Sequence, residues 1–205
     1  MKASEKREEL KILWEELLKI KPTYKDLLYI LKHVPELREK AWEKLLEKGV
    51  SNEDLSYIIK YVPELREKAW EKLLEQGASN DELYDLIQQF WGEPLREKMA
   101  QKILEQEPTN EELCYIIENF PALREKAWAK LLEQEVSNEE LCYIIANVKP
   151  LREKAGQKIL EQEPTNEELC YIIERVPELR EKAWVKLLEQ EVSNEDLSYI
   201  IKYVP

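Results

Sequence analysis

The chain of 205 residues has few of the residue types on which enzymes and β-sheet proteins depend. It contains one histidine, four glycines and two phenylalanines. The single histidine, His33, has no Ser or Cys partner recognisable in the sequence, so there is little material for nucleophilic or acid–base catalysis. Scarce glycine together with abundant Leu, Glu, Lys and Ala is typical of a helical protein rather than a sandwich or barrel. We therefore expect an all-α protein that is not an enzyme.

Positive charge and long apolar runs are lacking as well. Lys and Arg number 31 against 43 Asp and Glu, which gives a formal net charge of -12 at pH 7. Affinity for nucleic acid depends on Lys and Arg that neutralise phosphates, so neither nucleic acid nor an acidic membrane is an expected partner. The sequence shows neither a signal peptide nor a membrane-spanning run, and we expect a cytoplasmic location.

Cysteine is scarce, at three residues. Cys114, Cys142 and Cys170 recur at a fixed spacing in a chain without a secretory signal, which predicts free thiols rather than a disulfide framework. Their spacing lacks the Cys-x-x-Cys clustering of zinc sites. We therefore expect the three cysteines to be small packing residues, and we expect the protein to bind no metal and no cofactor.

An internal repeat dominates what the sequence does contain. The string Leu-Arg-Glu-Lys begins at Leu37, Leu65, Leu95, Leu123, Leu151 and Leu179, with spacings of 28, 30, 28, 28 and 28 residues. Trp14 lies 28 residues before Trp42 and marks an earlier, degenerate copy. The sequence thus predicts one domain over residues 1–205 made of seven repeats, with approximate boundaries at 9–36, 37–64, 65–94, 95–122, 123–150, 151–178 and 179–205.

Each repeat carries start and stop signals for two helices. Proline opens the first helix, as at Pro35, Pro63 and Pro177, and a glycine follows it at Gly49 and Gly77. The second helix begins at a Ser or Thr followed three residues later by Asp or Glu, which is the signature of a capping box. These pairs are Thr23/Asp26, Ser51/Asp54, Ser79/Glu82, Thr109/Glu112, Ser137/Glu140, Thr165/Glu168 and Ser193/Asp196. About fourteen helices result, each marginal alone in water, so stacking must stabilise the fold.

The repeated helix pairs resemble the α-solenoid class typified by HEAT, armadillo and tetratricopeptide repeats, from about Glu9 onward. Trp42 and Leu45 fit the tetratricopeptide signature, whereas Leu46 stands where that signature has glycine, and the period is short for all three families. The resemblance implies a right-handed superhelix whose concave surface, often lined by the second helices, holds a protein or peptide. It carries over no catalytic residue.

Two columns of second-helix residues lie on the side opposite the apolar Leu and Ile stripe. The tyrosine column is broken only by Asp85, and its members are Tyr29, Tyr57, Tyr115, Tyr143, Tyr171 and Tyr199. The variable column stands four residues later on the same side, and consists of His33, Tyr61, Gln89, Asn119, Asn147, Arg175 and Tyr203. Tyrosine suits interface anchors, and variation among near-identical copies is what distributed recognition produces, so these columns predict a binding face. The alternative is that these exposed positions vary freely in sequence because no function constrains them.

Two irregularities add candidate binding residues. Ala100 and Gly156 interrupt a column of tryptophans, and a missing indole implies either a groove or a repacked core. A two-residue insertion at Trp91-Gly92 lies close to Asp85 and Gln89, where the repeat pattern also breaks. It predicts a ligand-facing tryptophan, a bend in the solenoid or a mere loop irregularity.

One arginine per repeat lies near the apolar face of the first helix. This arginine column consists of Arg38, Arg66, Arg96, Arg124, Arg152 and Arg180. We expect each guanidinium to pair with an Asp or Glu on the second helix of a neighbouring repeat, as a structural ladder rather than an anion site.

These patterns favour a scaffold that binds a protein or peptide through its second-helix face. One alternative is a structural or designed module without a natural ligand, which could associate head-to-tail through the uncapped end after Tyr203. A minor alternative is an RNA reader that contacts one base per repeat, against which the acidic charge argues.

Overall fold

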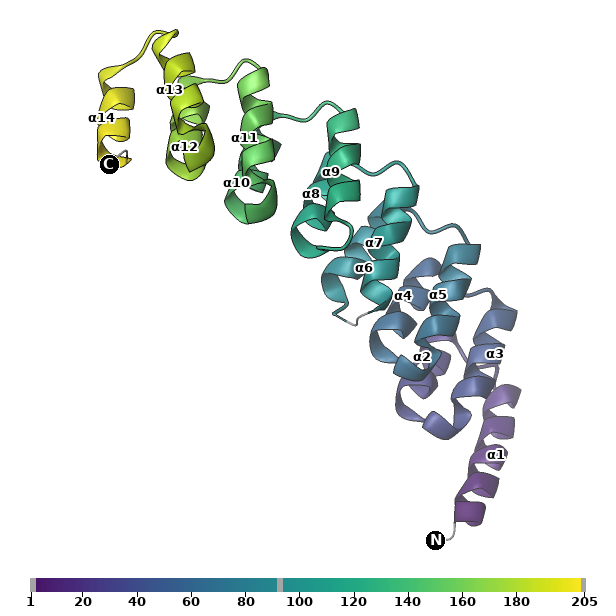
Figure 1. Cartoon of the computed structure of the whole chain (residues 1–205). Coiled ribbons are helices and arrows are strands. Elements are labelled where there is room, and N and C mark those ends of the chain that lie inside the picture. The colour runs from purple at the N-terminus through teal and green to yellow at the C-terminus, as the bar shows by residue number, and fades with distance from the viewer. Residues whose placement is uncertain (1–2, 92–93, 204–205) are drawn as a thin grey trace. The chain divides into compact units, whose positions relative to one another are not determined.

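The computed structural model describes residues 3–91 and 94–203, which consist of helices and their connections (Figure 1). These residues form fourteen α-helices and four short 3-10 helices, and no strand. The α-helices are α1 (Ala3–Lys19), α2 (Tyr24–His33), α3 (Arg38–Lys48), α4 (Asn52–Tyr61), α5 (Arg66–Glu75), α6 (Asn80–Gln89), α7 (Leu95–Glu105), α8 (Asn110–Asn119), α9 (Arg124–Glu133), α10 (Asn138–Asn147), α11 (Arg152–Glu161), α12 (Asn166–Arg175), α13 (Arg180–Leu188) and α14 (Asn194–Tyr203). The 3-10 helices are η1 (Pro35–Leu37), η2 (Pro63–Leu65), η3 (Lys149–Leu151) and η4 (Pro177–Leu179). The predicted all-α repeat fold is confirmed.

All seven predicted capping boxes are present. At α4, for example, the Ser51 hydroxyl accepts from the Asp54 backbone N–H, while the Asp54 carboxylate accepts from the Ser51 backbone N–H. Ser193 and Asp196 make the same reciprocal pair at α14, at 2.9 and 3.1 Å. Each box satisfies backbone donors that the first helical turn leaves unpaired, and each is worth about 1 kcal/mol. The second helices therefore begin where the sequence predicts.

The prolines do not open α-helices directly. Pro35, Pro63 and Pro177 each begin a 3-10 turn of three residues, and the α-helix starts only after it. A residue before proline is held away from helical geometry, and Val34 has φ -125° and ψ 82°. At the other end of α3, Gly49 has φ 84°, a left-handed conformation that glycine adopts without a steric penalty.

Packing divides the chain into two compact units, Met1–Arg96 and Glu97–Pro205. In the first unit, α2 packs on α3, α4 packs on α5, and α2, α4 and α6 follow one another in direct contact. In the second unit, α8 packs on α9, α10 on α11 and α12 on α13, and α8, α10, α12 and α14 follow one another in the same way. Within each unit the second helices form one layer and the first helices the other (Figure 1).

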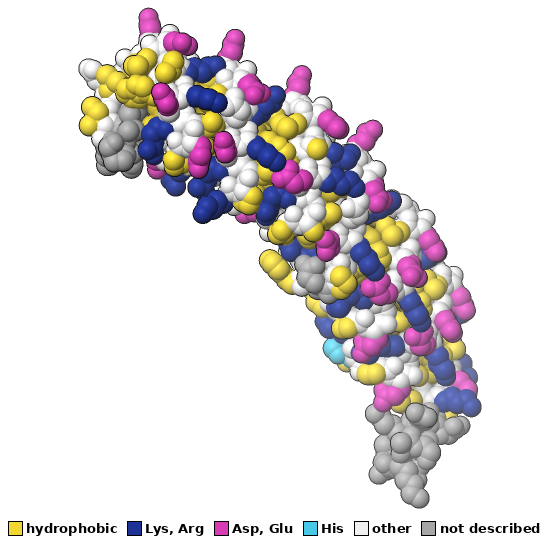
Figure 2. Space-filling model, viewed as in Figure 1, with side chains coloured by type: hydrophobic (Ala, Val, Ile, Leu, Met, Phe, Trp, Pro, Cys, Tyr) yellow, Lys and Arg dark blue, Asp and Glu magenta, His cyan; other side chains and the backbone are white. Residues whose placement is uncertain are grey.

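The core lies between these two layers. The predicted stripe of α4 is fully buried, because Leu55, Ile58, Ile59 and Val62 are all 0% exposed. On the first helices, Ala41 and Trp42 are buried in the same way, and Trp128 occupies the equivalent place in the second unit. Outside the core, acidic and basic side chains are interspersed over both units, with apolar side chains visible between them (Figure 2).

The arginine column forms a ladder, but its predicted partners were wrong. Arg66 Nε donates to the Ile59 carbonyl oxygen at 2.8 Å, close to the end of α4. Equivalent bonds join Arg38 to Leu31, Arg96 to Ile87, Arg124 to Ile117, Arg152 to Ile145 and Arg180 to Ile173. The last carbonyls of a helix lack intrahelical donors and carry the negative end of its dipole, so they attract a guanidinium. Where Arg38 also meets a carboxylate, at 2.6 Å, it is that of Glu64 in η2 and not one on a second helix.

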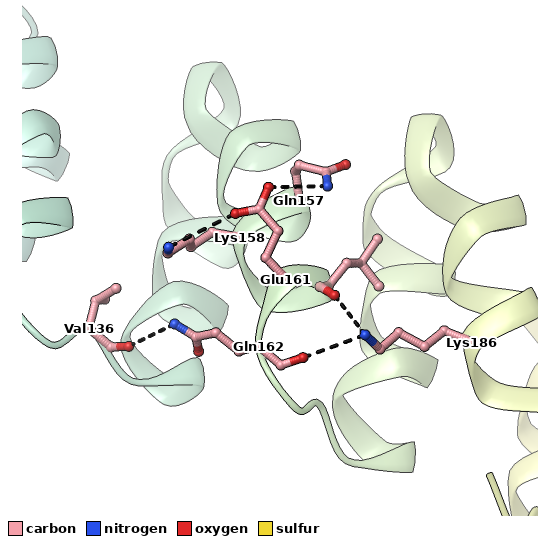
Figure 3. A network of polar contacts seen from close by, with 7 residues as sticks. Val136, Gln157, Lys158, Glu161, Gln162 and Lys186 are labelled. Atoms are coloured by element: carbon pink, nitrogen blue, oxygen red, sulfur yellow. Dashed lines mark hydrogen bonds and ion pairs between the residues drawn. The ribbon is translucent and has the colours of Figure 1, made fainter. Parts of the chain in front are cut away.

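A second set of polar contacts joins the ends of α5, α9, α11 and α13 to the starts of the second helices that precede them, and Figure 3 shows the contact at α11. Gln162 Nε2, just beyond α11, donates to the Val136 carbonyl oxygen at 3.2 Å, immediately before the cap of α10. Gln76, Gln134 and Gln190 make the corresponding bonds to Val50, Pro108 and Pro164. Lys186 reaches the Leu160 carbonyl oxygen at 2.8 Å and so ties α13 to the end of α11. Within each unit, these junctions between repeats thus have hydrogen bonds in addition to apolar contacts.

Candidate binding face on the second helices

The tyrosine column and the variable column lie side by side on each second helix. The rings of Tyr29 and His33 are 4.5 Å apart between centroids, and those of Tyr57 and Tyr61 are 4.7 Å apart. On α12 the Arg175 guanidinium carbon lies 5.8 Å from the Tyr171 ring centroid. We call the surface formed by these two columns the tyrosine face. The side chains of its predicted members Tyr199 and Tyr203 lie outside the described residues.

Much of the tyrosine face is open to solvent. Tyr29 is 63% exposed, Tyr61 50% and Tyr143 43%, while Tyr57, Tyr115 and Tyr171 are half-buried. In the variable column, His33, Gln89, Asn147 and Arg175 are exposed and Asn119 is half-buried. Aromatic rings with one covered and one open side provide contact area at low entropic cost, because tyrosine has only two rotatable bonds to order.

The two asparagines of the variable column are oriented by their own helices. Asn119 Nδ2 donates to the Tyr115 carbonyl oxygen at 2.9 Å, and Asn147 Nδ2 donates to the Tyr143 carbonyl oxygen at 2.9 Å. A carboxamide has two N–H donors and an acceptor oxygen, so each side chain keeps further hydrogen-bonding capacity beside its tyrosine. Both amides are therefore held in place next to an aromatic ring.

A third column, which the sequence interpretation missed, links consecutive second helices. We call it the bridging column; it stands three residues after the tyrosine position and consists of Lys32, Lys60, Gln88, Glu118, Ala146, Glu174 and Lys202, whose side chain lies outside the described residues. Lys32 Nζ lies 4.4 Å from the Tyr61 ring centroid on the next second helix, and Glu118 accepts a hydrogen bond from the Tyr143 hydroxyl. The signal that could have revealed this column is its variation between Lys, Glu and Ala within otherwise similar copies.

The charge of the tyrosine face differs between α2 and the later second helices. α2 carries Lys25 and Lys32, whereas α4 carries Glu53 and α6 carries Asp85. In the second unit the corresponding positions and their neighbours carry carboxylates, at Glu111, Glu118, Glu139, Glu167 and Glu174. Apart from Arg175 and Lys202, the charged residues at these positions of the second unit are therefore carboxylates.

The two irregular positions differ in what they expose. Trp91 is 79% exposed, and the Arg96 guanidinium carbon lies 5.1 Å from its ring centroid, whereas Gly92 lies outside the described residues. Gly156 is buried, and a Cβ atom placed on it would lie 2.9 Å from Leu179 Cδ1. Neighbouring side chains thus fill the space, so of the two alternatives, a groove or a repacked core, the structure favours the repacked core at Gly156.

The three cysteines are free thiols. Burial raises the pKa of Cys114 to about 12 and that of Cys142 to about 11, and it also raises the pKa of Cys170. Because the thiolate is the nucleophile and the metal ligand, the raised pKa values disfavour the reactive form of these thiols at neutral pH. Among the described residues, no group of three His, Cys, Asp or Glu side chains is arranged to hold a metal ion.

No protein-family model, no curated protein and no solved structure matches this chain. The assignment to a helical-repeat class therefore rests on the paired helices themselves, and the likeness to HEAT, armadillo or tetratricopeptide repeats stays a prediction. Within the described residues, no helix combines the length and the apolar character needed to cross a bilayer.

Proposed function

We propose that the chain is a non-enzymatic scaffold of the HEAT, armadillo or tetratricopeptide kind that binds a protein or an extended peptide along its tyrosine face. The observation that carries this proposal is the pairing of an exposed or half-exposed tyrosine with a recognition-type side chain four residues later, repeated on successive second helices. Free thiols suit a reducing compartment, so we place the protein in the cytoplasm.

The repeat geometry suits an extended ligand. Packed helices lie about 8–10 Å apart, and an extended chain rises about 3.3 Å per residue. Within one unit, successive tyrosines would therefore meet about every third residue of a bound peptide. Such a ligand would gain one aromatic contact and one polar contact per repeat. Each contact contributes little binding free energy alone, and the contributions add along the second helices.

The charges favour a cationic partner. The chain has a formal net charge of -12, and the tyrosine face of the second unit carries Glu118 and Glu174 beside its tyrosines. Complementary charge speeds association and discriminates against anionic competitors. RNA is disfavoured for the same reason, because carboxylates at the bridging positions would stand next to its phosphates.

Binding should depend on the tyrosines of the second unit. We expect the double variant Tyr115→Ala/Tyr143→Ala to bind a peptide selected on the wild-type chain at least tenfold more weakly, or about 1.4 kcal/mol, because it removes two central anchors. Calorimetric titration of the selected peptide measures this loss, and circular dichroism verifies that the variant is folded.

The matched control is Lys126→Ala/Glu153→Ala, which alters two exposed first-helix side chains and preserves net charge. It should bind as the wild type does. Unchanged affinity in the folded tyrosine variant, or an equal loss in the control, would show that the ligand binds elsewhere.

A further inference from the structure

The tyrosine face of the first unit is interrupted by a pocket between α4 and α6. The pocket has a volume of about 330 Å³, and its lining includes Glu53, Ser56, Lys60, Glu82, Asp85 and Gln89. Asp85 occupies the tyrosine position of α6, so a short carboxylate replaces a phenol ring. The pocket is therefore a consequence of the one break in the tyrosine column.

The bridging residue explains why the space stays open. At the α2–α4 junction this residue lies against the tyrosine of the next helix, with Lys32 Nζ 5.6 Å from the Tyr57 ring centroid, and at the α8–α10 junction Glu118 accepts a hydrogen bond from the Tyr143 hydroxyl. Lys60 has no such ring to cover and instead donates to Gln89 Oε1 at 2.7 Å. This bond holds the one ammonium group of the pocket against an amide, away from a carboxylate partner.

The lining is anionic, with three carboxylates against one ammonium group. Glu82 is fixed, because it accepts from the Ser79 backbone N–H at 2.9 Å and from Asn52 Nδ2 at 3.0 and 3.1 Å. The Ser79 bond is the main reason that the pKa of Glu82 lies below its usual value, so this carboxylate is charged at neutral pH. Glu53 and Asp85 are exposed and form no ion pair with another described residue.

The spacing of these carboxylates selects the kind of cation. No three acidic groups within the described residues converge closely enough for a metal ion. A guanidinium group, by contrast, is planar, has five N–H donors and can bond carboxylates on more than one side. A volume of about 330 Å³ stands at the lower end of small-ligand sites, which suits one long side chain.

We propose that the α4–α6 pocket binds an arginine side chain of the partner, with Asp85 and Glu53 as its principal carboxylate acceptors. The peptide origin of that arginine rests on the proposed function, whereas the affinity of the pocket for a guanidinium group does not. Arginine would then fix the register of a bound peptide on the first unit.

The pocket can be tested with a blocked amino acid, independently of any peptide. We expect N-acetyl-arginine methylamide, titrated into the ¹⁵N-labelled full chain, to give saturable amide shift changes confined to α4 and α6. The citrulline analogue has nearly the same shape without the charge, and it should bind at least tenfold more weakly. Equal responses to the two compounds, or no saturable response to arginine, would overturn the proposal.

Three variants assign the binding to Asp85. Asp85→Asn keeps the size of the side chain and should weaken arginine binding at least fivefold. Asp85→Tyr restores the residue that other repeats carry at this position, so it should fold, fill the pocket and abolish binding. Asp81→Asn removes an exposed carboxylate of the same helix that does not line the pocket, and it should bind as the wild type does. Wild-type binding by Asp85→Tyr, or equal losses in Asp81→Asn and Asp85→Asn, would contradict the assignment.

The outcomes for the pocket and for the tyrosine face are separable. The Tyr115→Ala/Tyr143→Ala variant alters the second unit, so arginine should bind to its first unit unchanged. Arginine binding without any peptide binding would support the pocket and overturn the proposed function. Peptide binding without arginine binding would support the proposed function and overturn the arginine pocket.

Discussion

At the scale of single residues, Gly156 shows how a missing side chain can be compensated by closer packing. The equivalent positions in neighbouring repeats hold Trp128 and Trp184, and the loss of an indole would leave a large cavity if nothing moved. Instead Leu179 and Val176 occupy the space in front of Gly156. The space in front of Gly156 is thus filled by one side chain of its own repeat, Val176, and one of the next repeat, Leu179.

We predict that restoring tryptophan at this position destabilises the protein. Gly156→Trp should lower the free energy of unfolding by about 1–3 kcal/mol or more, because the indole has no room beside Leu179. Gly156→Ala should stay within about 1 kcal/mol of the wild type, since its gain in helix propensity offsets a small shift of a flexible leucine end. Urea unfolding measures both, and a Trp variant more stable than the wild type would show that a groove is open there.

At the scale of elements, an asparagine at the start of α4, α8, α10 and α12 ties that helix to the next second helix. Asn52 donates to Glu82, Asn110 Nδ2 to Glu140 at 3.1 Å, Asn138 Nδ2 to Glu168 at 2.8 Å, and Asn166 Nδ2 to Asp196 at 3.2 Å. The acceptor in every case is the carboxylate that completes a capping box. These carboxylates therefore stabilise their own helix and its contact with the preceding repeat at the same time.

The dual role of Glu82 predicts a pH dependence. Its folded-state pKa is lowered, chiefly by the Ser79 backbone N–H, so its stabilising effect is complete above the ordinary Glu pKa of about 4.3 and is lost as the pH falls through the lowered value. Glu82→Gln can still complete the box but does not titrate. The variant should be less stable than the wild type at pH 7, and the difference in free energy of unfolding should be smaller at a pH well below the ordinary Glu pKa. A constant gap in urea unfolding at the two pH values would contradict this role.

Prediction from sequence succeeds where the signal is local to one helix. The Ser and Thr caps specify where helices begin, because a cap and its acidic partner are three residues apart. The spacing of four residues from Tyr57 to Tyr61 places both rings on one side of the helix. The partner of Arg66 could not be predicted in this way, because its acceptor is a backbone carbonyl that every residue possesses. The pocket at Asp85 was equally hidden, since its walls come from two helices.

At the scale of the whole molecule, the division at Arg96 and Glu97 follows closely on the Trp91-Gly92 insertion. Contacts in a repeat protein join neighbouring repeats, so stability is a sum of local terms. Two compact units in one chain should then respond separately to a local defect.

We expect Leu141→Ala to loosen the second unit far more than the first. Leu141 is fully buried in α10, and truncating it costs about 2–5 kcal/mol. Hydrogen exchange followed by mass spectrometry should show faster exchange over α8 to α14, with little change over α2 to α5. The converse variant, Leu55→Ala in α4, should show the opposite pattern. Equal acceleration in both units would mean that the chain unfolds as a single cooperative body.

The asparagine bonds between successive helix starts also bear on how the chain folds. A capping carboxylate that is already in place offers the preceding asparagine a ready acceptor, and an ordered asparagine orients the next carboxylate. Folding can accordingly nucleate at any repeat and propagate to the repeats on both sides. Because each new contact joins neighbouring repeats, no long loop has to be closed. A chain built this way should be able to gain or lose whole repeats in evolution. Each new copy brings an asparagine and a capping carboxylate, and the neighbouring repeats already carry the matching acceptor and donor.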